Sequence, residues 1–178
     1  MLLANIYVAE KTLYHFPSNS ILRKHSTPKP KQIKELGKLL KSLGYNLDYS
    51  SSKNLADSLD KMQRQDDEFF NKLVRILTTR TMNEANYFCT ANVDYPEFRH
   101  YGLACSAYTH FTSPIRRYAD VLVHRLLAAA IDIESLPKTM CNKQRLTKIC
   151  DKMNMRHRNA RNASRASSDY HTYLFFRV

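Results

Sequence analysis

Long apolar segments are missing from this chain, because no uninterrupted hydrophobic run approaches the roughly 20 residues that a membrane-spanning helix needs. The first residues, MLLANIYVAEK, are apolar at the start but lack the basic beginning and the small-residue cleavage site of a signal peptide. Internal repeats and low-complexity tracts are missing as well. We therefore expect no membrane partner.

Metal-binding cysteine patterns are also missing. The chain has four cysteines, none of which forms a CxxC pair with another, and its seven histidines suggest no ligand cluster. This spacing excludes a recognisable zinc site and a compact disulfide framework. Reduced thiols in an intracellular compartment are the expected state of Cys89, Cys105, Cys141 and Cys150.

Acidic residues are scarce relative to basic ones: 16 Asp and Glu stand against 28 Lys and Arg, which gives a net charge of +12 and a pI near 9.6. Clustered Lys and Arg displace counterions from phosphates, so this balance favours a polyanionic partner such as nucleic acid. A basic surface that merely keeps the protein in solution is the alternative. We interpret the one run of acids, Asp66, Asp67 and Glu68, as a solvated helix start rather than a metal site.

The chain is long enough for one domain or a large piece of one, and a hydrophobic content of 43% suffices for a packed core. Apolar spacing and turn residues predict a helix-rich α+β fold. Two antiparallel strands are predicted in NYFCT and HYGLACSAY, while PSNSILRKHSTPKP is predicted as a loop. The predicted helices cover Met1–Tyr14, Lys31–Leu43, a short segment that Ser52 caps, Asp67–Thr81, Ser113–Ile131 and Lys143–Phe175.

The spacing of apolar residues also predicts which helix faces are buried. We expect Leu2, Leu3, Ile6 and Leu13 to share one side of the first helix, and Gly44 to end the second. In the fifth predicted helix the expected buried stripe is Ile115, Ala119, Leu122, Leu126 and Ala130. The last predicted helix carries much of the net charge on Lys143, Arg145, Lys148, Lys152, Arg156, Arg158, Arg161, Arg165 and Arg177.

The segment YTHFTSPIRRYADVLVHRLL, residues 108–127, is the most informative stretch for function. Ser113 is a preferred N-cap and Pro114 suits the first helical position, so the unpaired N–H groups of a helix start are expected beside Arg116 and Arg117. Guanidinium forks match phosphate oxygens, and an i, i+4 pair with Asp120 would orient Arg116. The alternative is a helix start with two solvated arginines.

This segment resembles the arginine signature of the ribonuclease II (RNB) family, which reads SPIRRY here, from Ser113 to Tyr118. The resemblance extends to MLLANIYVAE, to ILRKH with Pro28, and to NLADSLD, LVRILTTRTM, YFC, HYGLA, RHRNARNASRAS and YLFF. These segments are most similar to the branch that contains the catalytic subunit of the eukaryotic RNA exosome. The resemblance implies that residues 1–178 are the C-terminal part of one RNB catalytic domain, whose few strands belong to a larger sheet.

The resemblance implies a processive hydrolytic 3′→5′ exoribonuclease that degrades single-stranded RNA in RNA processing and decay. It makes Arg116 the catalytic arginine, which holds the phosphate and offsets developing negative charge. Exosome core subunits are the implied protein partners, and the nucleus, including the nucleolus, and the cytoplasm are the implied locations. The implied RNA-binding residues are Asn5, Arg23, His25, Tyr108, His110, Ser113, Arg117 and Tyr118.

Family members hold Mg²⁺ with four aspartates in a DxDD-type cluster that this sequence lacks, so the chain is expected to contribute no metal ligand. The aspartate-bearing part is expected upstream and an S1-type RNA-binding barrel downstream. The chain alone is expected to be a poor nuclease or an inactive one. Two alternatives stay open: an RNA-binding module without catalysis, and a helical protein-interaction domain.

Overall fold

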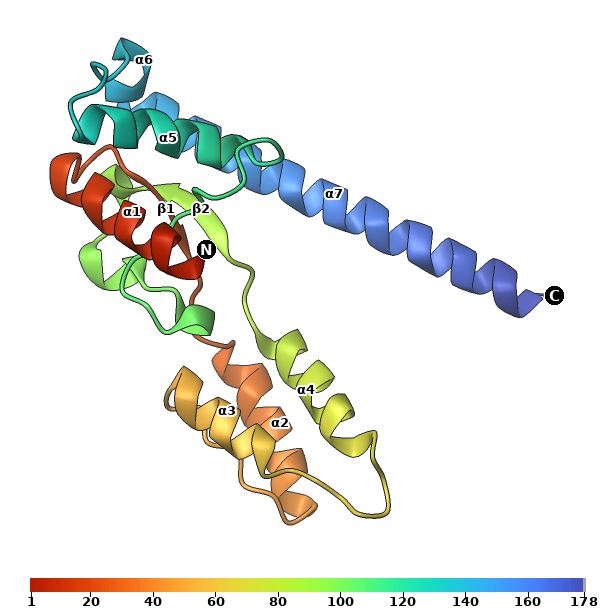
Figure 1. The fold of residues 1–178 in the computed structure, drawn as a ribbon. Coiled ribbons are helices and arrows are strands. Elements are labelled where there is room, and N and C mark those ends of the chain that lie inside the picture. Colours follow the sequence, from red (N-terminus) through yellow and green to blue (C-terminus); the bar gives the residue numbers. More distant parts are fainter. Residues whose placement is uncertain (178) are drawn as a thin grey trace. The chain divides into compact units, whose positions relative to one another are not determined.

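The computed structural model describes residues 1–177, which are mostly helical and form two compact units (Figure 1). Unit 1 consists of residues 1–22, 87–94 and 109–177, and unit 2 of residues 23–86 and 95–108. The helix-rich α+β class predicted from the sequence is confirmed. Within the described residues, no helix is long and apolar enough to cross a membrane.

Unit 1 contains helices α1 (Leu2–His15), α5 (Tyr118–Ala130), α6 (Lys138–Cys141) and α7 (Lys143–Arg177), together with the 3-10 turn η1 (Thr90–Asn92). Helix α1 packs against α5. Apolar side chains from separate parts of the sequence meet in one core, whose buried members are Val8, Ile21, Tyr87, Cys89, Ala119, Leu122, Val123, Leu126, Met140, Leu146 and Cys150.

The buried face of α1 differs from the predicted one. Its buried residues are Asn5, Val8, Ala9 and Thr12, whereas Leu2 and Leu3 are 56% and 63% exposed. The spacing i, i+3, i+4, i+7 of the buried set is still that of a helix stripe. Two of its members are polar, and Thr12 satisfies its hydroxyl by donating to the Val8 carbonyl at 2.9 Å. The positions of the apolar residues alone therefore predicted the wrong buried face of α1.

Strands β1 (Ile21–Lys24) and β2 (Asn86–Cys89) form a two-stranded antiparallel sheet. In unit 1, the pairing continues where the Thr90 amide donates to the Ser20 carbonyl at 3.0 Å. The strand predicted in NYFCT is confirmed, but β1 lies in the predicted loop. Strand β1 was not predicted because its partner strand is distant in sequence, and because the polar residues around it favour a loop.

The prediction of a strand in HYGLACSAY is wrong. This segment forms the 3-10 turn η3 (Tyr101–Leu103), followed by Ala104 in the left-handed region with φ of 53°. Its bridge pairing consists of two isolated bridges, a parallel one between His25 and His100 and an antiparallel one between His100 and Cys105. The glycine-containing turn interrupts the extended backbone that its aromatic and β-compatible residues otherwise favour.

Unit 2 is built mainly from α2 (Pro30–Ser42), α3 (Ser52–Asp60) and α4 (Phe70–Thr81), with η2 (Tyr95–Phe98) and η3. The three predicted helices are confirmed, with shifted starts. Ser51, rather than Ser52, caps α3 by accepting from the Asn54 amide at 3.0 Å. Gly44 follows α2 with φ of +86°, a conformation suited to glycine after a helix end. The buried apolar core is Ile33, Leu36, Leu40, Leu47, Leu55, Leu59, Met62, Phe70, Val74 and Tyr101.

Helix α7 confirms the long C-terminal helix predicted from the sequence. Leu146 and Cys150 are its buried residues, and Met153 packs against the unit 1 core. Asn154 lies beside β2, since its side chain both accepts from the Tyr87 amide and donates to the Tyr87 carbonyl, each at 2.8 Å. Most side chains beyond Met155 are exposed in this chain.

Candidate nucleic-acid interface

The SPIR segment, residues 113–116, forms a turn ahead of α5 and not the first turn of that helix. The amides of Arg116 and Arg117 donate to the Ser113 carbonyl at 3.3 and 3.2 Å, and α5 begins only at Tyr118. The predicted cap at Ser113 is therefore wrong, because Arg117 occupies the N-cap position without a side-chain cap bond. Serine followed by proline suits both a helix start and the first two positions of a β-turn, and here the turn prevails.

The predicted pairing of Arg116 with Asp120 is also wrong, because Arg117 takes that place. Arg117 donates from Nε to Oδ2 and from Nη2 to Oδ1 of Asp120, each at 2.8 Å. The Ser113 amide donates to the same carboxylate at 2.8 Å. Asp120 is fully buried, so these three bonds satisfy a charge that would otherwise be costly to bury. The ion pair holds the turn against the first turn of α5.

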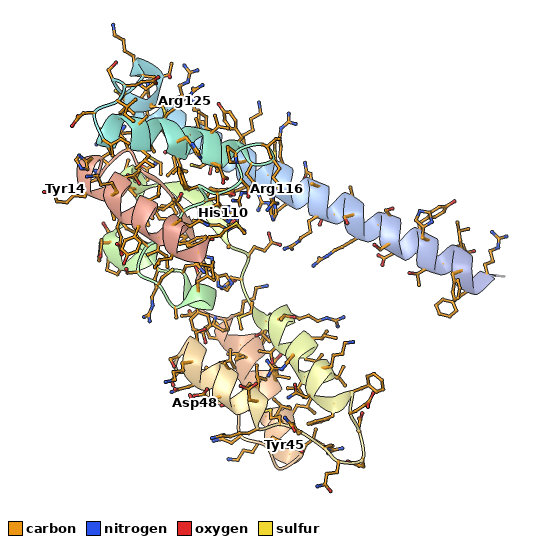
Figure 2. All side chains as sticks on the ribbon, in the orientation of Figure 1. Tyr14, Tyr45, Asp48, His110, Arg116 and Arg125 are labelled. Carbon is orange, nitrogen blue, oxygen red and sulfur yellow. The ribbon has the colours of Figure 1, made fainter. Side chains whose placement is uncertain are left out.

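Arg116 is exposed on this turn, beside the beginning of α5 (Figure 2). Within residues 1–177 its guanidinium makes no ion pair. Ile115 next to it is 98% exposed, which contradicts its predicted place in the buried stripe, while Ala119, Leu122, Leu126 and Ala130 are buried as predicted. Tyr118 is 56% exposed. Arg116 thus has a donor fork that solvent or a ligand can reach.

Asn5 and His110 belong to the same unit as Arg116 and make defined contacts there. Asn5, which is 3% exposed, accepts from the Phe111 amide through Oδ1 at 3.0 Å. His110 Nδ1 lies 2.6 Å from the Tyr87 hydroxyl. Phe111 also stacks on His124, whose Nε2 lies 2.9 Å from the Phe111 carbonyl. These contacts fix the backbone leading into the SPIR turn.

Arg23, His25 and Tyr108 lie in unit 2. The Arg23 amide donates to the Tyr108 carbonyl at 2.7 Å. His25 uses both ring nitrogens: Nε2 contacts the Asn83 carbonyl at 2.8 Å, and Nδ1 lies 3.0 Å from the Gly102 amide. Since a carbonyl only accepts and an amide only donates, Nε2 is the donor and Nδ1 the acceptor in these two contacts. Both ring nitrogens thus have partners within unit 2.

His100 is a residue of unit 2 that sequence reasoning missed. It is 9% exposed, and its ring lies at centroid distances of 5.2 Å from His25 and 5.3 Å from Tyr108. Burial, reinforced by the nearby His25 and Arg23, lowers the pKa of His100 to about 4, so the ring is neutral at pH 7. A histidine beside a glycine-containing turn carries no sequence signal for such burial.

The residues described do not fit a magnesium site. No group of three or more His, Cys, Asp or Glu side chains in residues 1–177 is placed to hold a metal ion. Asp66, Asp67 and Glu68 are exposed, and Asp67 accepts from the Phe69 amide at 2.9 Å just before α4. No metal chemistry is therefore assigned to the side chains of residues 1–177.

The sequence matches the RNB domain family over residues 1–133. It is 51% identical over 178 residues to an Arabidopsis thaliana protein named Exosome complex exonuclease RRP44 homolog A, covering 100% of this chain and 19% of that protein. It is 51% identical over 172 residues to the Schizosaccharomyces pombe protein named Exosome complex exonuclease dis3, covering 96% of this chain and 18% of the relative. The chain thus spans about a fifth of each relative.

Solved structures are similar to the chain as well. RNase R of Mycoplasma genitalium, in complex with ribose methylated single-stranded RNA, matches with a TM-score of 0.77 and 31% identity over 98% of this chain and 27% of that one. Yeast Ssd1, described as a pseudonuclease, matches with a TM-score of 0.74 and 31% identity over 85% of this chain and 18% of its own. The family resemblance of the SPIRRY segment is confirmed, and the chain belongs to the RNB domain family.

Proposed function

We propose that this chain is the phosphate-holding part of a processive hydrolytic 3′→5′ exoribonuclease that degrades single-stranded RNA. The proposal rests mainly on the different environments of two neighbouring arginines. Arg117 is held by the buried Asp120, whereas Arg116 is exposed on the turn before α5. Arg116 is therefore the arginine whose fork can reach a phosphodiester.

The chemistry assigned to Arg116 follows from its charge and position. During attack on a phosphodiester, negative charge grows on the phosphate oxygens, and a guanidinium fork can donate to two of them. Donors whose position is fixed before the reaction stabilise that charge without reorganising. Here the turn is fixed by the Ser113 carbonyl and by the Arg117–Asp120 pair, which together position the Arg116 backbone.

The names of the relatives and the RNA bound to RNase R support an RNA substrate and an exonuclease activity for the whole protein. We assign RNA contacts to Asn5, Arg23, His25, Tyr108, His110, Ser113, Arg117 and Tyr118 as part of the proposal. Of these, Tyr118 is the most exposed aromatic and offers a ring for base stacking. For Arg117, the ion pair with Asp120 favours a positioning role over direct phosphate binding.

Mg²⁺, held by aspartates outside this chain, would supply activation of water and further charge neutralisation in the whole enzyme. Exosome core subunits are the proposed protein partners, because the relatives are named as exosome complex exonucleases. We also propose that the whole protein acts in the nucleus, including the nucleolus, and in the cytoplasm.

A non-catalytic RNA-binding module is the second candidate. It is favoured by the similarity to Ssd1, which is described as a pseudonuclease, since this fold also occurs without cleavage. The two candidates predict different results for the whole protein with RNA and Mg²⁺: the first predicts release of mononucleotides, the second salt-dependent binding without turnover.

The test measures single-turnover cleavage of a labelled single-stranded RNA by the full-length parent, which is the whole protein that we propose contains this chain. Equilibrium RNA binding is measured at the same fixed salt concentration. Arg116→Ala should lower the cleavage rate of bound RNA by about 100-fold or more, the scale of losing one preorganised charge-stabilising donor. RNA affinity should fall much less, because many Lys and Arg residues share backbone contacts.

Arg125→Ala is the matched control, since Arg125 is an exposed arginine of α5, the helix that follows the turn with Arg116. It should cleave at the rate of the unchanged enzyme. Equal loss in both variants, or an Arg116→Ala variant that binds weakly but cleaves bound RNA at full rate, contradicts the catalytic role.

A further inference from the structure

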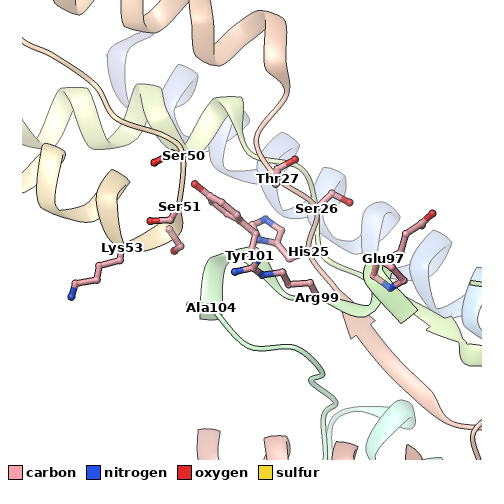
Figure 3. A pocket seen from close by; sticks show the side chains of 12 residues that line it. His25, Ser26, Thr27, Ser50, Ser51, Lys53, Glu97, Arg99, Tyr101 and Ala104 are labelled. Carbon is pink, nitrogen blue, oxygen red and sulfur yellow. The ribbon is translucent and has the colours of Figure 1, made fainter. Parts of the chain in front are cut away.

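Unit 2 contains a pocket of about 590 Å³ that is separate from the SPIR turn in sequence. Its walls come from the loop after β1, the start of α3 and the η2–η3 region (Figure 3). The lining is rich in hydroxyl groups and basic side chains, including Ser50, Ser51, Lys53, Arg99 and Tyr101. This volume is within the range of small-molecule sites and accommodates a nucleotide.

The start of α3 borders this pocket and leaves backbone donors unused. Ser51 caps the Asn54 amide through its side chain and the Leu55 amide through its carbonyl, at 3.0 Å each. The amides of Ser52 and Lys53, ahead of Asn54, have no hydrogen-bond partner within residues 1–177. Unpaired amides at a helix start, together with the helix dipole, favour an anion.

Tyr101 gives independent support for a ligand at this place. Its side chain is 7% exposed, and its buried hydroxyl has no hydrogen-bond partner in the described chain. Figure 3 shows this hydroxyl pointing toward the Ser50–Ser51 wall of the pocket. Burial, with a contribution from Asp48, raises the pKa of Tyr101, so the group stays a donor. A buried donor without an acceptor is costly, and a ligand oxygen would satisfy it.

Two exposed basic side chains in the pocket wall favour an anion, against the single carboxylate of Asp48 near Tyr101. Lys53 and Arg99 are exposed in its wall and make no ion pair within residues 1–177. The one carboxylate among the lining residues, Glu97, is paired with Lys24 at 2.9 Å. His25 uses both ring nitrogens for contacts to the Asn83 carbonyl and the Gly102 amide.

We propose that this pocket of unit 2 binds a phosphate group, which receives hydrogen bonds from the start of α3, Lys53, Arg99 and the Tyr101 hydroxyl. The group can come from a phosphodiester of an RNA backbone or from a free nucleotide, which share the same tetrahedral anion. The site stands on its own geometry and does not depend on a catalytic role for Arg116.

The test uses the 178-residue chain in a phosphate-free buffer, with the amide resonances of Ser52 and Lys53 followed by NMR. Three probes are titrated: adenosine 5′-monophosphate, a single-stranded oligoadenylate with hydroxyl ends, and adenosine. The nucleotide, the oligoadenylate or both should shift the two amides, and adenosine should leave them unchanged. A response to the oligoadenylate alone identifies a diester ligand, and a response to the nucleotide alone identifies a free phosphate.

Lys53→Gln and Arg99→Gln should each weaken binding by about 10-fold, the scale of one charge-assisted hydrogen bond. Tyr101→Phe, which removes only the unpartnered hydroxyl, should weaken it by about 3- to 10-fold. Lys61→Gln is the matched control, because Lys61 is an exposed lysine at the other end of α3.

Three results would contradict the proposal that this pocket binds a phosphate group. One is the absence of any shift at Ser52 and Lys53 with both phosphate-bearing probes. Another is an equal shift with adenosine, and the third is an equal loss in Lys61→Gln and Lys53→Gln. Arg116→Ala should retain the binding, so a failure of the proposed cleavage role and a failure of this site are distinguishable.

Discussion

Arg117 and Asp120 form a two-bond ion pair across the start of α5, with Nε–Oδ2 and Nη2–Oδ1 distances of 2.8 Å. The carboxylate is fully buried and the arginine side chain is 20% exposed. Because the Ser113 amide also donates to Asp120, one carboxylate joins the SPIR turn to the helix. Two adjacent arginines therefore have different environments, and their substitutions should separate stability from activity.

We expect Arg117→Ala to lower the free energy of unfolding by about 3 kcal/mol or more, because it leaves a buried carboxylate without its partner. Arg116→Ala should change it by less than about 0.5 kcal/mol, since Arg116 is exposed and makes no ion pair among residues 1–177. Urea denaturation of the chain measures both values. Equal destabilisation by the two substitutions would show that the ion pair does not hold the turn.

Arg116→Lys should restore only part of the cleavage rate that Arg116→Ala loses in the full-length parent. An ammonium group keeps the charge but lacks the planar fork that donates to two phosphate oxygens. Single-turnover rates of the unchanged enzyme and the two variants give the comparison. Full activity in Arg116→Lys would reduce the role of Arg116 to that of a point charge.

His100 should make the chain less stable in mild acid. Burial lowers its pKa in the folded chain to about 4 from the ordinary 6.5, so between these values the unfolded chain binds the proton and the folded chain does not. Protonation therefore favours unfolding, and the free energy of unfolding falls as pH decreases from 6.5 to 4. We expect His100→Gln to remove about 2 kcal/mol of this pH-dependent loss.

Urea denaturation at pH 7 and at pH 4.5 measures that loss for each variant. His15→Gln serves as the control because His15 is exposed near the end of α1. Its pH dependence should match that of the unchanged chain. If His100→Gln retains the full loss, other groups cause the acid sensitivity.

Thiol labelling should distinguish Cys141 from Cys150. Cys141 is exposed, whereas Cys150 is 1% exposed and burial raises its pKa to about 12. The reactive species is the thiolate, so at pH 7.5 a maleimide should modify Cys141 and leave Cys150 unmodified until the chain unfolds. Peptide mass spectrometry after brief labelling locates the modified residues. Modification of Cys150 at the rate of Cys141 would show that α7 leaves its core contacts readily.

The helices of this chain follow from local sequence, because caps, prolines and apolar spacing act within a few residues. Pro30 starts α2, one residue before the predicted Lys31, and Gly44 follows its end with positive φ, as predicted. The SPIRRY segment also indicates the family through the order of its residues alone. Short-range signals of this kind need no knowledge of distant partners.

Tertiary structure decided which local signal prevailed. Ser113 and Pro114 suit either a helix start or a turn, and the turn prevails where the Ser113 amide reaches the buried Asp120. Strand β1 exists because β2, distant in sequence, supplies its hydrogen bonds. The pocket beside Tyr101 likewise joins Lys53 and Arg99 from separate segments. Sequence thus determined the helices and the family, whereas the side-chain partners depend on long-range packing, which a local pattern does not encode.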